Sequence, residues 1–304
     1  MCFKHKLNNK FVKLLYVCHL HLTLRTGTMG LMKSLNLMWD RCVHQYFNRP
    51  YRLKTTVNTG DAQVVILLHG IGRSGNVWSH VIEGLKEQNC QVVAFDLLGF
   101  GGSPKPQWLE YTVDDHARAV IKSIKAEKLD RPVVLVGHSM GCLVAARVGV
   151  LEPSFVKRLI LYEMPLYDGL PETRRYKAQI DLYYSLYNKI IAFTPSFGTT
   201  STTRARKLVE KLISQEITAE SWQPFVRSLE NTIMKQSAAS DIKNITVPIE
   251  MIYGSRDLLV IRGKVTKIFG KESKHITAHT INARHTLSVK ASDFIVERIK
   301  LILN

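Results

Sequence analysis

Ser139 is a candidate nucleophile, because it lies between two glycines in the run Gly137-His138-Ser139-Met140-Gly141. Residues 132–136 are almost wholly apolar, which predicts a short strand buried on both faces. The small and apolar residues at 142–150, followed by Pro153, predict a buried helix with a defined end. A tight turn between them would lift the hydroxyl above the sheet edge and aim free helix N–H groups at any negative charge that develops there. This arrangement suits attack on an acyl carbon.

A nucleophilic serine needs a base, and a histidine whose tautomer is fixed by a carboxylate can act as one. Asp257 and His285 each follow a predicted strand within a few residues, so both are expected at the carboxyl edge of the sheet near Ser139. Glu163 also follows a predicted strand and is the alternative acid. The strands in question are predicted at residues 156–162, 247–253 and 275–281.

Acyl transfer also needs two N–H groups that converge on the developing oxyanion. The His69-Gly70-Ile71-Gly72 loop follows a predicted strand, and the Ile71 amide can pair with the Met140 amide in this role. We expect His69 and Asp96 to orient nearby backbone rather than to catalyse.

Two further local patterns predict how the chain enters the sheet and the helices. Residues 52–57 and 64–68, joined by Asn58-Thr59-Gly60-Asp61, predict a β-hairpin. Thr112 and Asp115 have the spacing of a capping box and predict the start of a helix that reaches about Lys125.

The His-Gly loop, residues 96–103 and residues 137–141, in this order, resemble an α/β-hydrolase across roughly residues 60–300. The resemblance implies a mainly parallel central sheet with helices on both faces, a nucleophile elbow, and the order serine, acid, histidine. It also implies a helical lid inserted after the strand that ends near Tyr162. The alternation of predicted strands and helices points independently to an α/β fold. The expected parts are residues 1–50 as a basic leader with an amphipathic helix, 51–163 and 241–304 as the core, and 164–240 as the lid.

The expected lid lacks a buried strand and has helical patterns at 175–193, 202–214 and 219–235. Aromatic residues at helical spacing are more often core than substrate contacts. Candidate substrate contacts are nevertheless His138, Trp78, Tyr183 and Tyr187.

These residues together predict a serine esterase with Ser139, His285 and Asp257 as a triad, acting on a partly apolar small-molecule ester. Thioester or carbon–carbon bond hydrolysis on the same machinery is an alternative, as is a non-catalytic receptor. A serine nucleophile argues against the carboxylate chemistry of epoxide hydrolases and haloalkane dehalogenases. No metal or organic cofactor is needed; His275 and His279 share a strand face, but no third ligand is evident.

The formal net charge of +17 is concentrated near the start, where residues 1–55 hold ten Lys or Arg and one acid, a net +9. A solvated leader is the simplest interpretation, weak contact with anionic membranes is an alternative, and nucleic acid is not favoured. Apolar residues at helical spacing predict a helix at 31–46 that docks on the body. His19 and His21 interrupt the one signal-like stretch, and Met29 is an alternative start.

The cysteines favour a reducing compartment. The five cysteines show no paired or metal-ligand spacing, and Cys90 and Cys142 lie in apolar surroundings. We therefore expect a cytoplasmic protein, with peripheral membrane contact as the alternative. The sequence leaves the oligomeric state open.

Overall fold

The computed structural model describes residues 28–47, 49–129, 132–167, 174–192, 217–257, 259–260 and 274–303. The chain divides into two compact units, Met1–Pro50 and Tyr51–Asn304. In the first unit, α2 (Thr28–Arg41) continues into a π-helical turn, Cys42–Tyr46, so the helix expected at 31–46 is confirmed. Its docking on the body and the proposed lipid contact stay predictions, and residues 1–27 of the expected leader lie outside the described residues. None of the described helices has the length and apolar character to span a bilayer.

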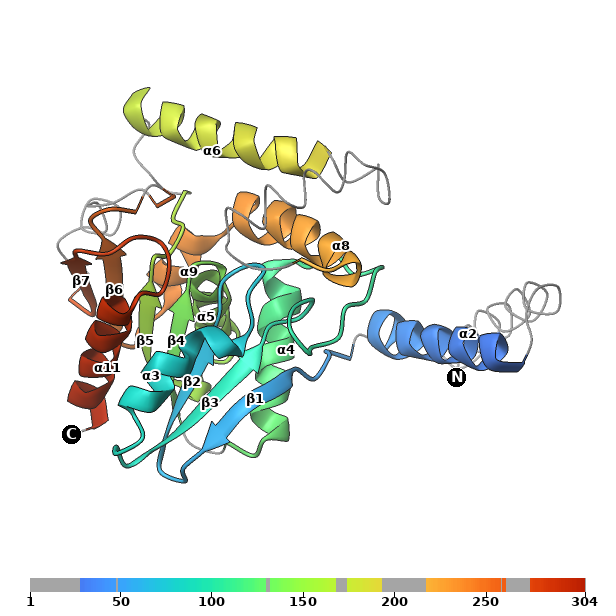
Figure 1. The fold of residues 1–304 in the computed structure, drawn as a ribbon, viewed down its shortest axis with the longest axis horizontal. Helices are drawn as coiled ribbons and strands as arrows, with labels where there is room; N and C mark the ends of the chain where they lie inside the picture. The colour runs from blue at the N-terminus through green and yellow to red at the C-terminus, as the bar shows by residue number, and fades with distance from the viewer. Residues whose placement is uncertain are drawn as a thin grey trace, which may run out of the picture. The chain divides into compact units, whose positions relative to one another are not determined.

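The second unit is built on a seven-stranded sheet in the order β1-β3-β2-β4-β5-β6-β7 (Figure 1). All neighbouring strands are parallel except β1, which runs antiparallel to β3. The predicted mainly parallel sheet is therefore confirmed. The strands are β1 (Lys54–Thr59), β2 (Gln63–Leu68), β3 (Cys90–Asp96), β4 (Val133–His138), β5 (Val156–Tyr162), β6 (Ile249–Gly254) and β7 (Ile276–Ile281).

The predicted hairpin between residues 52–57 and 64–68 is wrong. β1 pairs with β3, and β2 lies on the other side of β3 between β3 and β4. The burial of the two strands explains this order. Five of the six residues of β2 are buried, so it belongs inside the sheet, whereas β1 has none buried and suits an edge.

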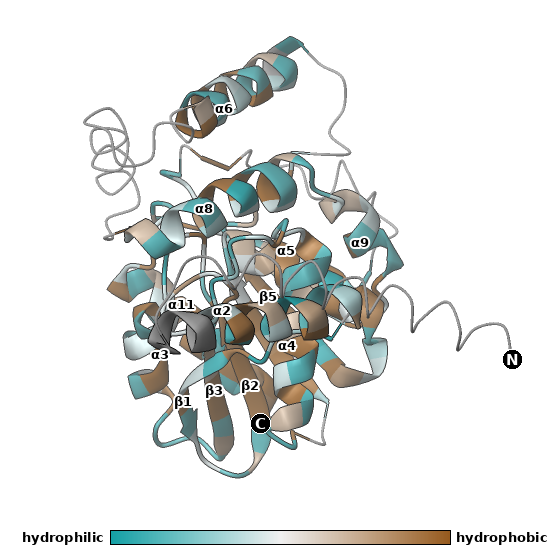
Figure 2. Cartoon of the chain, turned by 90° about the vertical axis from the view of Figure 1, so that its right-hand side faces the viewer, coloured by the Kyte–Doolittle hydropathy of each residue, from teal (hydrophilic) through white to brown (hydrophobic). Residues whose placement is uncertain are grey.

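Helices cover both faces of the sheet, as predicted. The apolar cluster on one face includes side chains of α4 and α5, and the cluster on the other includes side chains of α3 and α11. Figure 2 shows the strands β2 and β3 between these helices as mainly hydrophobic. The predicted capping box of Thr112 and Asp115 starts α4. The four helices are α3 (Ser79–Gly84), α4 (Val113–Ala126), α5 (Met140–Leu151) and α11 (Val289–Leu303).

The insertion between β5 and β6 is helical in its described parts. Figures 1 and 2 both show α6 (Arg174–Ala192) and α8 (Ala219–Ser228) beyond the same end of the sheet. α8 runs into a π-helical turn, Leu229–Met234, which α9 (Ala238–Asn244) follows. The helices expected at 175–193 and 219–235 are thus present, and the one expected at 202–214 lies outside the described residues. That the insertion acts as a lid stays a prediction.

Candidate active site

Ser139 occupies a strained turn between β4 and α5. Its φ of 53° and ψ of −120° are rare for a residue with a side chain, and such a conformation costs about 1–3 kcal/mol. The neighbouring glycines permit the turn: a Cβ on Gly137 would lie 2.7 Å from the Cys142 nitrogen, and a Cβ on Gly141 would lie 2.3 Å from the Leu68 carbonyl oxygen. The Ser139 amide also donates to the Tyr162 carbonyl at 2.9 Å. Packed backbone therefore fixes the serine.

The structure brings the three candidate catalytic side chains into one hydrogen-bonded chain. The Ser139 Oγ lies 3.0 Å from the His285 Nε2, and the His285 Nδ1 lies 2.7 Å from the Asp257 Oδ2. Because a carboxylate can only accept, the Nδ1–H donates to Asp257. The Nε2 of neutral His285 is then unprotonated and can accept the serine proton, which is the tautomer that a general base requires.

Asp257 is buried immediately after β6, yet its surroundings favour the ionised carboxylate. Burial opposes ionisation, but hydrogen bonds from His285 and Glu163 and from the Leu259 amide outweigh it and lower the pKa of Asp257. The Leu259 amide donates to the Asp257 Oδ1 at 2.7 Å. Asp257 thus remains charged and can stabilise an imidazolium on His285.

Glu163, the alternative acid, lies beside Asp257 rather than taking its place. It directly follows β5, is fully buried with φ of 53°, and its Oε1 accepts the Gly254 amide at 2.5 Å. One side-chain nitrogen or oxygen atom of each of Glu163, Asp257 and His285 lies within 4.8 Å of the other two. The neighbouring Glu163 side chain is one of the groups that lower the pKa of Asp257.

The loop that carries His285 is held by two side chains from other strands. The Tyr162 hydroxyl, at the end of β5, donates to the Arg284 carbonyl at 2.7 Å. His138, at the end of β4, donates from Nε2 to the His285 carbonyl at 2.8 Å. The rings of His138 and Tyr162 stack with their centroids 5.5 Å apart. Burial, together with the nearby His285, lowers the pKa of His138 to about 3. Sequence reasoning missed Tyr162, because nothing marks a strand-end tyrosine as a support for a distant loop.

The candidate oxyanion donors come from two backbone segments that meet at Ser139. A Cβ on Gly70 would lie 3.2 Å from the Ser139 Cβ, so the loop carrying Ile71 passes close to the nucleophile. Met140 is the first residue of α5, and the amide at this helix position has no partner within the helix. That the Ile71 and Met140 amides together form an oxyanion hole stays a prediction.

His69 and Asp96 hold this loop, as predicted. The Leu97 amide donates to the His69 Nε2 at 2.8 Å, so the protonated His69 Nδ1 donates to the Gly70 carbonyl at 2.7 Å. Burial lowers the pKa of His69 to about 4, which keeps this pattern intact at neutral pH. The Asp96 carboxylate accepts the amides of Gly75 and Gly102, each at 2.7 Å.

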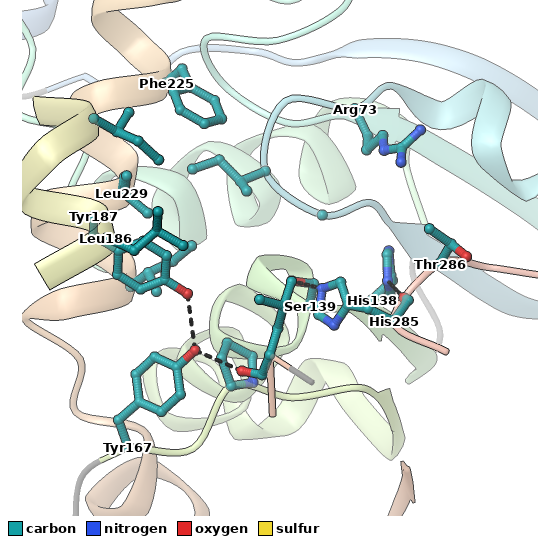
Figure 3. A pocket seen from close by; sticks show the side chains of 16 residues that line it. Arg73, His138, Ser139, Tyr167, Leu186, Tyr187, Phe225, Leu229, His285 and Thr286 are labelled. Carbon is teal, nitrogen blue, oxygen red and sulfur yellow. Dashed lines mark hydrogen bonds between the residues drawn. The ribbon is translucent and has the colours of Figure 1, made fainter. Parts of the chain in front are cut away.

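A cavity opens at Ser139, between the carboxyl ends of the strands and the helices α6 and α8 (Figure 3). It encloses about 990 Å³ of free space, its open mouth included. Tyr187 lines it from α6, and its hydroxyl lies 3.1 Å from that of Tyr167. The described lining residues are Gly70, Ile71, Arg73, His138, Ser139, Pro165, Tyr167, Leu186, Tyr187, Ile190, Phe225, Leu229, Ile233, Leu259, His285 and Thr286.

Two of the four predicted substrate contacts lie elsewhere. Trp78 is fully buried in the cluster that packs against α3 and α11, because the 3₁₀ turn Gly75–Trp78 carries it to that face of the sheet. Tyr183 is buried in the other cluster, with its ring 5.5 Å from that of Tyr167. His138 and Tyr187 do line the cavity.

Comparison with known proteins agrees with this architecture. A family model described as alpha/beta hydrolase fold matches residues 63–288. The chain belongs to the α/β-hydrolase family. This α/β-hydrolase has the same fold as a thermophilic esterase from Thermogutta terrifontis, with a TM-score of 0.61 and 19% identity over 83% of this chain and 92% of that one.

Two curated relatives match over shorter stretches of this α/β-hydrolase. One is "Probable lysophospholipase BODYGUARD 4" of Arabidopsis thaliana, 39% identical over 36% of this chain and 26% of that protein. The other is "2-hydroxy-6-oxo-6-(2'-aminophenyl)hexa-2,4-dienoic acid hydrolase" of Metapseudomonas resinovorans, 40% identical over 34% of this chain and 37% of that protein. The matched stretches thus span about a quarter to two fifths of these relatives.

Proposed function

We propose that this protein is a serine hydrolase that cleaves carboxylic esters through an acyl-enzyme intermediate. The observation that carries the proposal is the series of hydrogen bonds from the Ser139 Oγ through His285 to Asp257. Ser139 and His285 line a largely apolar cavity. Family membership supports a hydrolase, and the Arabidopsis relative, named as a probable lysophospholipase, supports an ester as the substrate.

In the first half of the reaction, the His285 Nε2 takes the proton of Ser139 as its Oγ attacks the acyl carbon. Asp257 stabilises the resulting imidazolium, and the amides of Ile71 and Met140 donate hydrogen bonds to the negatively charged former carbonyl oxygen. Each such donor contributes about 3 kcal/mol to the stability of the transition state. His285 then gives its proton to the leaving alcohol.

In the second half, a water molecule takes the place of the alcohol. His285 accepts a proton from this water, which attacks the acyl carbon bound to Ser139 and regenerates the tetrahedral oxyanion. Collapse of this intermediate returns the proton to the Ser139 Oγ and releases the acid. The same residues act in both halves, so a change to any of them affects acylation and deacylation together.

Turnover of 4-nitrophenyl esters tests the proposal. We expect the wild-type protein to hydrolyse a short-chain ester, and Ser139→Ala to abolish turnover while the protein stays folded by circular dichroism. Ser79→Ala is the matched control, because Ser79 is an exposed serine at the start of α3. Persistent turnover in Ser139→Ala, or none in the wild type across a range of acyl chains, would contradict the proposal.

Carbon–carbon bond cleavage is the second candidate, because the Metapseudomonas relative is named as a hydrolase of a dienoic acid. Assays of a thioester and of a β-diketone beside the ester separate the candidates. A kcat/KM for the diketone at least tenfold above that for the ester would favour the second candidate. Labelling of Ser139 without turnover of any of these substrates would favour a receptor.

A further inference from the structure

The cavity at Ser139 has two ends of opposite character. In Figure 3, Leu186, Tyr187 and Leu229 lie on one side of the nucleophile, and Arg73 and Thr286 lie on the other. The first end is lined by α6 and by the segment that includes α8. The second end is lined by the loops that follow β2 and β7. A ligand that fills the whole cavity must therefore meet an apolar surface at one end and a cation at the other.

The backbone of Arg73 is held by its own loop. Its amide donates to the Gly70 carbonyl at 3.2 Å, within the segment that passes next to Ser139. Its guanidinium is partly buried, which lowers the pKa of Arg73, and its charge contributes to the low pKa values of His69 and His138. The cation therefore lies near the catalytic groups rather than on the open surface.

A smaller cavity that is also lined by Arg73 carries a second cation. Arg73 and Phe225 line both cavities, and Lys105 lines only the smaller one, with Thr218 and Ser221. The Lys105 ammonium is fixed by the carbonyls of Gly101, at 2.6 Å, and Ser103, at 3.2 Å. No Asp or Glu is among the described residues that line either cavity. Arg73 and Lys105 are thus the Lys or Arg side chains among these described lining residues.

The direction of proton transfer decides which part of a substrate meets Arg73. His285 Nε2 gives its proton to the leaving oxygen, so the leaving group must lie on the His285 side of Ser139. Thr286, the next residue in the chain, lines the cavity on that side. The rings of His285 and His138 lie 5.3 Å apart, and the charge of Arg73 is close enough to lower the pKa of His138. The acyl chain then occupies the apolar end beside Tyr187.

We propose that the substrate is an ester with an apolar acyl chain and an anionic leaving group, a carboxylate or a phosphate, which the Arg73 guanidinium binds. This inference rests on the proposed esterase function and adds the substrate class. A guanidinium binds either anion through two parallel N–H···O bonds, and Lys105 adds a second charge nearby. Arg73 is then a specificity-determining residue of the leaving-group side.

Esters that share a hexanoyl group and differ in the substituent on the leaving phenol test this proposal. The neutral ester is 4-(hexanoyloxy)phenylacetamide, and the anionic ones are 4-(hexanoyloxy)phenylacetate and 4-(hexanoyloxy)benzyl phosphate. The methylene group keeps the reactivity of the leaving phenol similar in all three. We expect the wild-type protein to have a kcat/KM about tenfold higher for at least one anion than for the amide, and the higher value identifies carboxylate or phosphate. The monoanion of 4-nitrophenyl adipate, charged on its acyl part, should be a poorer substrate than 4-nitrophenyl hexanoate.

Substitutions at Arg73 connect this preference to the residue. Arg73→Gln should reduce the ratio of anionic to neutral kcat/KM to near one, and Arg73→Lys should retain part of it, because the charge remains without the planar fork. Arg118→Gln is the matched control, since Arg118 is an exposed arginine on α4 that does not line the cavity. It should leave the ratio unchanged. A wild-type ratio near one for both anions, or an unaltered ratio in Arg73→Gln, would overturn the inference.

A binding measurement separates this inference from the esterase proposal. Titration calorimetry with the product (4-hydroxyphenyl)acetate and its amide needs no turnover. Tighter binding of the acid to the wild type, lost in Arg73→Gln, would support the anion site even if no ester were hydrolysed. Equal binding of acid and amide, with all three esters hydrolysed, would reject the anion site and leave the esterase proposal standing. If Arg73→Gln does not fold, Arg73→Lys and the wild-type substrate series decide the question.

Discussion

The two halves of the candidate site are held in place by different means. Ser139 is fixed by backbone packing, with glycines that leave no room for a side chain and strand β4 paired on both sides. His285 follows β7, an edge strand with no buried residue, and its loop is held by side-chain hydrogen bonds from Tyr162 and His138. Ser139 thus belongs to the core, whereas His285 belongs to a surface loop that hydrogen bonds connect to the core.

This difference has a consequence for mutations. A change at the elbow should reduce folding stability and activity together, because the same backbone packing provides both. A change in the side-chain hydrogen bonds to the histidine loop should reduce activity more than stability, because Ala283 is the one buried residue among residues 282–288. The predictions below test this contrast.

Loss of the acid should have the largest effect. Asp257→Asn retains the size of the side chain, but an amide that donates toward the His285 Nδ1 favours the wrong tautomer. We expect kcat to fall by roughly 10⁴-fold with the thermal midpoint nearly unchanged. Steady-state kinetics and calorimetry check both parts. A fall of less than tenfold would show that another carboxyl, with Glu163 the nearest, carries the role.

Gly141→Ala should combine a loss of activity with a loss of stability. Its Cβ would lie 2.3 Å from the Leu68 carbonyl oxygen, so the elbow must shift. We expect stability to fall by roughly 1–3 kcal/mol and turnover by about 100-fold, measured by urea unfolding and ester kinetics. Gly149→Ala on the same helix is the control, because its Cβ would meet only flexible side chains of Ile245 and Leu159. Equal effects of the two variants would contradict the packing argument.

Tyr162→Phe should reduce activity with less effect on folding. It removes the hydroxyl that donates to the Arg284 carbonyl and frees the histidine loop to move. We expect kcat/KM to fall by about tenfold and stability by about 1 kcal/mol. Tyr253→Phe is the matched control, since that buried hydroxyl lies 3.8 Å from the Met251 sulfur. An unchanged kcat/KM in Tyr162→Phe would mean that the position of the His285 loop does not depend on this hydrogen bond.

Glu163→Gln should have the smallest effect. A glutamine can still accept the Gly254 amide through its oxygen and can donate to Asp257 through its nitrogen. We expect kcat to change by less than about threefold in Glu163→Gln. Glu163→Leu cannot donate a hydrogen bond, so the pKa of Asp257 should rise and the acidic limb of the pH–rate profile should shift to higher pH. A loss in Glu163→Gln comparable with that of Asp257→Asn would show that Glu163 acts as an ionised acid.

The sequence predicted the catalytic candidates because Ser139 and Asp257 each follow a strand that an apolar run marks, and His285 follows a strand rich in β-branched residues. Parallel strands bring their carboxyl ends to one edge, so local patterns were sufficient. Pairing across the sheet depends on residues far apart in the chain. Local patterns therefore predict a hairpin of β1 and β2, whereas β1 pairs with β3. The face that Trp78 occupies depends on the direction of a 3₁₀ turn, and the tie from Tyr162 joins residues 122 positions apart. Neither leaves a periodic signal.

The most direct test of the central claim is to trap the nucleophile covalently. The wild-type protein, Ser139→Ala and His285→Ala are incubated with a fluorophosphonate, digested, and analysed by peptide mass spectrometry. The account predicts one adduct on Ser139 in the wild type, none in Ser139→Ala, and strongly slowed labelling in His285→Ala. An adduct on another serine, or an unlabelled wild-type Ser139 in folded protein, would contradict it.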